Sequence, residues 1–211
     1  MSEKWEYRGS YLNYPIKPAV PYIIDKNIIM ASDLIDELPD FMKKADILFI
    51  DPPWNLRNLN TFYMKARLMP KVESYEEFYE ILFKRISEIK AKLCFLEIGK
   101  EYLADFIIEM KKLYKYVTFY NSTYYNNSKN LCYIVQGSEK RLNLKLDGMD
   151  EEKIIEFICK NLQYECIGDL CMGRGLVGFN SYLNNKNFVG IELNHKRLSV
   201  LLENISKRKY S

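Results

Sequence analysis

The sequence predicts an α/β protein of Rossmann-like form, with a mostly parallel sheet, helices on both faces and an antiparallel hairpin at one edge. Short apolar runs rich in β-branched and aromatic residues alternate with stretches whose apolar residues recur at helical spacing. This order is typical of parallel strands joined by helices. Strands covered on both faces are expected to be continuously apolar. The runs that predict such strands are residues 46–50, 92–97, 164–170 and 187–193.

The edge hairpin is predicted from two further runs, 116–120 and 131–136, which only a polar stretch separates. Near the start of the chain, residues 22–24 and 27–30 predict either a short strand pair or one interrupted strand.

The predicted helices are placed by their caps and by the spacing of their apolar residues. Ser74 and Glu77 form a capping box, and an apolar face runs from Phe78 to Ile89. A brief helix is expected at 33–38, and a loop at 55–71. The other predicted helices are residues 103–113, 151–162, a stretch that ends near Asn184, and a closing stretch with Leu198, Leu201, Leu202 and Ile205.

The chain has 211 residues, of which 48% are hydrophobic and 28% charged, enough for one globular domain with a sizeable core. We expect residues 22–211 to form this domain. Residues 1–21, with Trp5, three tyrosines and three prolines, are expected to form an irregular arm on its surface. The formal net charge is only +3, so a polyanionic partner would be held by local basic patches.

Cysteine and histidine usage argues against a metal site. The five cysteines form no CxxC pair and the single histidine is His195. Four cysteines lie in apolar runs, which is typical of buried thiols in a reducing, cytoplasmic location. No signal peptide and no membrane association are expected, because no apolar run approaches membrane-spanning length.

Asp51, Pro52, Pro53 and Trp54 directly follow the first predicted parallel strand. Proline offers no amide hydrogen to a neighbouring strand, so the two prolines end the strand and leave the chain stiff and extended. A carboxylate, a backbone carbonyl and an aromatic ring then lie at the strand end. They could hold a planar amino-substituted base: Asp51 and the Pro52 carbonyl would accept its amino hydrogens, and Trp54 would stack on its face. The alternative is an ordinary strand end with a core tryptophan.

A second group of candidate residues follows a later predicted strand. Asp169, Gly173 and Gly175 precede a helix, where glycines let the backbone pass close to a ligand and the helix N-terminus offers amides. The next strand ends with Glu192 and Asn194, and an acid there can accept both hydroxyls of a ribose. The pattern predicts a nucleoside-cofactor site. Both groups lie at carboxyl ends of predicted strands, where open α/β sheets bind ligands.

The stretch 55–71 contains no acidic residue and combines basic with aromatic side chains. Such a loop could contact phosphates and stack on bases. The alternative is a solvated surface loop with its rings turned inward. The polar tip of the predicted hairpin, 121–130, offers further residues of both kinds. The candidate nucleic-acid-binding residues are Arg57, Phe62, Tyr63, Lys65, Arg67, Tyr124 and Lys129.

This layout resembles the amino-methyltransferases that methylate adenine or cytosine in nucleic acids with S-adenosylmethionine. It is most similar to the permuted members, in which the Asp-Pro-Pro-aromatic motif precedes the glycine motif, over residues 22–208. The form that begins with aspartate and ends with tryptophan is typical of adenine enzymes, including the mRNA adenosine methyltransferases. The chain departs from the family at Leu170 and Cys171, where a Pro-Phe pair is common, and before residue 151, where a proline-bearing cofactor segment is usual.

The resemblance implies S-adenosylmethionine as the cofactor. Its methionine carboxylate and ammonium would lie near the two glycines and Asp51, its ribose at Glu192 beside Asn194, and its adenine towards Asp33. The implied catalytic residues are Asp51, Pro52, Pro53 and Trp54. The implied cofactor-binding residues are Asp33, Asp51, Asp169, Gly173, Gly175, Glu192 and Asn194.

The function expected from this resemblance is transfer of a methyl group to the exocyclic amino group of adenine in DNA. The alternatives are an RNA adenosine methyltransferase and a non-catalytic partner subunit that binds nucleic acid. DNA is favoured over RNA as the partner. No stretch is long enough for a separate recognition domain, so the target is expected to be short and loosely defined, or read together with a second subunit in a homodimer or with a partner.

Overall fold

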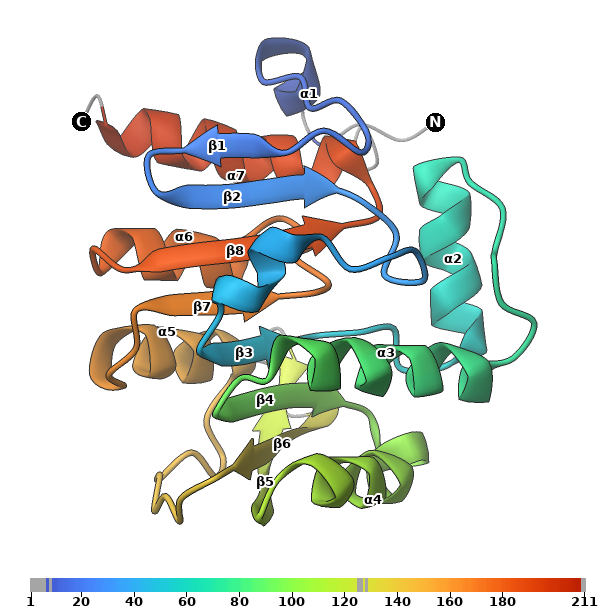
Figure 1. Ribbon diagram of the computed structural model, residues 1–211, viewed down its shortest axis with the longest axis vertical. Helices are drawn as coiled ribbons and strands as arrows, with labels where there is room; N and C mark the ends of the chain where they lie inside the picture. The colour runs from blue at the N-terminus through green and yellow to red at the C-terminus, as the bar shows by residue number, and fades with distance from the viewer. Residues whose placement is uncertain (1–6, 8, 125–126, 128, 210–211) are drawn as a thin grey trace.

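The computed structural model describes residues 7, 9–124, 127 and 129–209, and these residues form one eight-stranded sheet (Figure 1). Trp5 of the expected arm lies outside this part of the chain. The strand order is β1-β2-β8-β7-β3-β4-β6-β5. The strands are β1 Tyr22–Ile24, β2 Asn27–Ala31, β3 Ile47–Ile50, β4 Leu93–Ile98, β5 Tyr116–Thr123, β6 Leu131–Ser138, β7 Cys166–Asp169 and β8 Asn187–Glu192.

The central strands β2, β8, β7, β3 and β4 run parallel to one another. At one edge, β6 pairs antiparallel with both β4 and β5, which gives the expected hairpin. At the other edge, β1 and β2 form an antiparallel pair rather than one interrupted strand. The predicted fold class is therefore confirmed.

Helices cover both faces of the sheet: η2, α3 and α4 lie on one face, and α5, α6 and α7 on the other (Figure 1). Within the described residues, no helix is long and apolar enough to cross a membrane. The α-helices are α1 Ser10–Asn13, α2 Leu56–Ala66, α3 Tyr75–Ile89, α4 Leu103–Leu113, α5 Glu151–Asn161, α6 Leu176–Leu183 and α7 His195–Lys209, and the 3₁₀ helices are η2 Asp40–Lys44 and η3 Lys100–Tyr102.

The central position of β3 explains its apolar sequence and fixes the direction of the residue that follows it. All four of its residues are buried. Leu48 and Ile50 pack into the core beneath α3 and α4, whereas Ile47 and Phe49 pack into the core beneath α5, α6 and α7. Because successive strand residues point to opposite faces, Asp51 continues the row of Ile47 and Phe49 and faces the side of α5.

The helix expected at 33–38 is wrong, because this stretch forms a turn. The Asp33 side chain accepts a hydrogen bond from the Ile35 amide at 3.0 Å, and the Asp36 amide donates to the Asp33 carbonyl at 3.1 Å. Aspartate favours such local turns over a helix interior. The first helical turn in this region is η2, which begins after Pro39.

The loop expected at 55–71 is also wrong, because Leu56–Ala66 is the helix α2. The Asn55 side chain caps it by accepting a hydrogen bond from the Asn58 amide at 2.9 Å. Leu59 and Tyr63, four residues apart, form its buried face. The helix ends at Arg67, whose backbone is left-handed, with φ 61°. In Figure 1, α2 lies beyond the carboxyl ends of the central strands.

Candidate functional site

A cavity of about 480 Å³ lies at the carboxyl edge of the parallel strands, within the size range of small-molecule sites. Its wall is contributed by the ends of β2, β3, β4, β7 and β8, by α2 and by the first residues of α5. Its acidic lining residues are Asp33, Asp51, Glu97, Glu151, Glu152, Asp169 and Glu192, and its basic lining residues are Lys65, Arg174 and Arg197.

Asp51 lines this cavity and is held by the residue three positions later. The Trp54 indole Nε1 donates a hydrogen bond to Asp51 Oδ1 at 3.1 Å. Burial raises the pKa of Asp51 to about 6, while the hydrogen bond from Trp54 opposes that rise. The Asp51 carboxyl group is therefore charged at neutral pH but becomes neutral in mild acid.

Trp54 lies beside the cavity rather than on its wall, as does Pro52. The Trp54 ring meets Tyr124 of the hairpin edge-on, with ring centroids 5.4 Å apart and an interplanar angle of 71°. A Cβ atom on Gly99 would lie 3.0 Å from the Trp54 ring, so glycine at this position makes room for the indole. Pro53 does line the cavity, and its carbonyl accepts a hydrogen bond from the buried Tyr75 hydroxyl at 2.6 Å. The motif is thus anchored on several sides.

The two glycines between β7 and α6 both have left-handed backbones, with φ 55° for Gly173 and φ 80° for Gly175, which other residues adopt at a cost. The Gly173 amide, expected to face a ligand, donates instead to Glu192 Oε2 at 2.7 Å. Gly175 does not line the cavity; Leu201 fills the space beside it. Asp169 is buried and its Oδ1 accepts from the Cys171 amide at 2.9 Å. Its burial raises its pKa well above the usual range.

Glu192 ends β8 and is buried on the cavity wall. Besides the Gly173 amide, it accepts the Asn194 amide at 3.1 Å through Oε1, and Arg197 Nη1 lies 3.6 Å from the same oxygen. An ionised carboxylate has about four acceptor sites, so Glu192 retains capacity for hydroxyl donors. Asn194 does not line the cavity. Its Oδ1 accepts from the Lys196 amide at 3.0 Å at the start of α7.

Asp33 lines the cavity at the end of β2, but its carboxylate is also a structural anchor. Its Oδ2 accepts from the Tyr63 hydroxyl at 2.8 Å, and Lys71 Nζ lies 3.6 Å from the same oxygen. Tyr63 is only 1% exposed. The expectation that Tyr63 contacts nucleic acid from a surface loop is therefore wrong, because the ring is packed on the inner side of α2.

The other nucleic-acid candidates divide into two groups. Phe62, Lys65 and Tyr124 line the cavity. The Phe62 ring lies between two cations, with Lys65 Nζ 5.3 Å and Arg197 Cζ 5.2 Å from its centroid. The residues outside the cavity are Arg57 and Arg67 on and after α2 and Lys129 near the hairpin tip, all of them exposed.

Four cavity residues of chemical interest escaped the sequence interpretation. Glu97 is the one charged residue of the otherwise apolar β4, and that isolation was a signal that could have found it. Glu151 begins α5 and reads as an ordinary first-turn acid. Arg197 and Tyr7 meet Glu192 from α7 and from the N-terminal arm, which no local pattern predicts.

No protein-family model matches the sequence, and no curated protein matches it. Solved structures match its fold. M1.HpyAVI in complex with SAM aligns at a TM-score of 0.58 and 12% identity over 84% of this chain and 98% of that one. A DNA modification methylase of Thermus thermophilus, complexed with S-adenosyl-L-methionine, aligns at 0.59 and 9% over 85% and 93%. The cytosine-N4-specific PvuII DNA methyltransferase aligns at 0.58 and 12% over 93% and 96%.

The chain therefore has the fold of S-adenosylmethionine-dependent DNA methyltransferases. The similarity extends over nearly the whole length of each neighbour, so no part of their common fold is missing from this chain. It does not distinguish adenine from cytosine as the target, because one of these neighbours is cytosine-N4-specific.

Proposed function

We propose that the protein transfers a methyl group from S-adenosylmethionine to the exocyclic amino group of adenine in DNA. The observation that carries this proposal is the position of Asp51. It leaves the central strand β3 on the wall of the same cavity as Glu192 and Gly173, with Trp54 and Tyr124 beside it. A base acceptor and a cofactor loop thus meet at one edge of a methyltransferase fold.

The residues present fit such a cofactor. Glu192 has acceptor capacity left for ribose hydroxyls, and Asp33 offers a carboxylate at the neighbouring strand end. Further along the cavity wall, two buried carboxylate oxygens of Glu97 and Glu151 have no hydrogen-bond partner among the described residues. When bound, S-adenosylmethionine supplies a methyl group on a sulfonium, which is already a strong electrophile.

The task left to the protein is therefore to position the amino group. Asp51 and the Pro52 carbonyl accept its two hydrogens and so turn the nitrogen lone pair towards the cofactor. Such positioning contributes up to about 7–11 kcal/mol in the best cases. Trp54 and Tyr124 hold the base ring, and Arg57, Arg67 and Lys129 are exposed for phosphate contacts. A base inside a duplex cannot reach such a cavity, so it must be flipped out.

The direct test is transfer of labelled methyl groups from S-adenosylmethionine to matched DNA and RNA pools, followed by nucleoside analysis. We expect N6-methyladenine in DNA. N4-methylcytosine would overturn the choice of base, and methylated RNA alone would overturn the choice of polymer. Cofactor binding without any product would favour the non-catalytic alternative.

Replacing Trp54 by alanine should weaken DNA binding by about 1–3 kcal/mol, the range for stacking of a base on an aromatic ring. Trp54→Phe should lose less, because it keeps a ring face. Both variants lack the hydrogen bond to Asp51, so the difference between them isolates the ring. The measurement is the affinity for an oligonucleotide with a flipped or unpaired adenine. Equal losses would assign Trp54 to packing against Tyr124 instead.

Transfer should depend on pH through Asp51. Its pKa is raised to about 6, and only the charged form accepts amino hydrogens well. The neutral fraction grows as pH falls through 6, so the rate at saturating substrates should be about tenfold lower at pH 5 than on the plateau. The Asp51→Asn variant, which has no carboxyl group to titrate here, should lack this inflection. A wild-type profile flat from pH 5 to 8 would contradict the assignment.

A further inference from the structure

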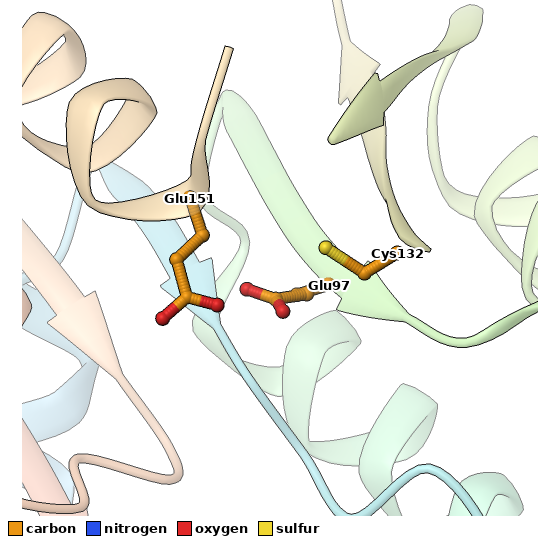
Figure 2. A group of neighbouring side chains, drawn as sticks. All are labelled: Glu97, Cys132 and Glu151. Carbon is orange, nitrogen blue, oxygen red and sulfur yellow. The ribbon is translucent and has the colours of Figure 1, made fainter. Parts of the chain in front are cut away.

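Glu97, Cys132 and Glu151 converge at the cavity from three separate elements, β4, β6 and the first turn of α5 (Figure 2). The candidate ligand atoms of the three side chains all lie within 4.8 Å of one another. In Figure 2 the two carboxyl groups face each other and the Cys132 sulfur is directed towards them. Glu97 and Glu151 both line the cavity.

The two glutamates are unusually buried for acids, with Glu97 1% and Glu151 6% exposed. Glu97 Oε1 and Glu151 Oε2 have no hydrogen-bond partner among the described residues. Buried polar groups are nearly always hydrogen-bonded, and a buried carboxylate without a partner is costly. Two such atoms facing each other therefore point to a ligand that donates hydrogen bonds.

The electrostatics of the cluster call for a cation. Burial, with the nearby charge of Asp51 as the next cause, raises the pKa of Glu97 well above its usual range and that of Glu151 to about 8. Cys132 stays a neutral thiol, because burial raises its pKa as well. The nearest basic residue with a described role, Arg197, is committed to Glu192 and the Phe62 ring at the other end of the cavity.

The strand order indicates which cation reaches this point. Moving across the sheet from Glu192 at the end of β8, the cavity passes Asp169 of β7 and Asp51 after β3 before it reaches Glu97 of β4. A nucleoside held at Glu192 thus leaves the rest of the cofactor extending towards the glutamates. In S-adenosylmethionine that remainder ends in an α-ammonium group, which has three hydrogen-bond donors and a positive charge.

We propose that Glu97 and Glu151 form the binding site for the α-ammonium group of the cofactor's methionine part. The inference rests on the proposed function, because it takes the cofactor from there. A divalent cation held by the two carboxylates and the Cys132 thiolate is the competing occupant of the same cluster.

Isothermal calorimetry with two ligands separates the ammonium contact from the rest of the cofactor. S-adenosylhomocysteine carries the ammonium group and is not consumed, whereas 5′-methylthioadenosine has the same nucleoside and thioether without the amino-acid part. In E97Q and E151Q, we expect the dissociation constant of S-adenosylhomocysteine to rise by about 10- to 100-fold, as for loss of a charged hydrogen bond. That of 5′-methylthioadenosine should change less than about twofold.

Glu152→Gln is the matched control, since Glu152 also lines the cavity but is exposed and next in sequence to Glu151. It should leave both ligands unaffected. Unaltered or tighter binding of S-adenosylhomocysteine by E97Q and E151Q, or equal loss of both ligands, would overturn this inference alone. Zn²⁺ binding that weakens S-adenosylhomocysteine and disappears in Cys132→Ser would also overturn it in favour of the metal. If neither nucleoside bound the unaltered protein, the proposed function itself would fail, and this inference with it.

Discussion

Replacing Asp51 with alanine is expected to lower the rate of methyl transfer by about 10²–10³-fold, as when one preorganised hydrogen-bonding group is removed from an active site. Asp51 lies at the end of β3 on the cavity wall and is the only side-chain acceptor proposed for the target amino group. The fold should survive, because Asp51 belongs to neither hydrophobic core cluster and its burial already disfavours its charge. The measurements are single-turnover rate and thermal unfolding.

Asp46→Ala is the matched control at the opposite end of the same strand. The Asp46 carboxylate accepts hydrogen bonds from the backbone amides of Glu165 and Cys166 at 3.1 and 3.0 Å. Its loss should therefore lower the unfolding temperature while leaving the transfer rate per folded molecule unchanged. Near-normal turnover by the Asp51 variant, or an equal loss of rate in both variants, would contradict the role given to Asp51.

Replacing Glu192 with alanine is expected to raise the cofactor dissociation constant at least tenfold, since one charged hydrogen bond is worth about 1.5–3 kcal/mol. Glu192 is the buried acid at the end of β8, and it also holds the Gly173 amide at 2.7 Å. The variant should therefore lose both the ribose acceptor and the ordering of the glycine loop. Calorimetry with S-adenosylhomocysteine measures the combined loss.

Glu192→Gln separates these two contributions. The amide keeps an oxygen for the Gly173 N–H, so the loop should stay ordered while the charged acceptor is lost, and the affinity should fall between those of wild type and Glu192→Ala. Binding of DNA in the absence of cofactor should change less than about twofold in either variant. Unchanged cofactor affinity in Glu192→Ala would show that the ribose lies elsewhere.

The parallel strands were predictable because each is buried on both faces, and only an apolar run satisfies that environment. The residues of β3 and β4 show this directly, since all of them are buried. Chain order then brought Asp51 and Glu192 to the same sheet edge, because carboxyl ends of parallel strands share an edge. The capping box of α3 was equally readable, as its Ser74 side chain accepts from the Glu77 amide at 3.0 Å.

The errors fell where local sequence is ambiguous and packing decides. The stretch 55–71 is basic and polar, so its helical period was hidden until Leu59 and Tyr63 found their place in the core. The same burial removed Tyr63 from the nucleic-acid candidates and gave its hydroxyl to Asp33. Helix propensity is a weak preference that tertiary contacts override in either direction.

The sequence by itself determined the sheet, the position of Asp51 at the end of a central strand, and the glycine loop followed by an acid, because each depends on residues adjacent in the chain. Only the tertiary structure decided that Glu97, Cys132 and Glu151 meet. Their convergence depends on the antiparallel pairing of β4 with β6 and on the placement of the first turn of α5 over the carboxyl edge. Contacts between residues so far apart in sequence follow from strand pairing and helix packing across the whole domain, which leave no local pattern to read.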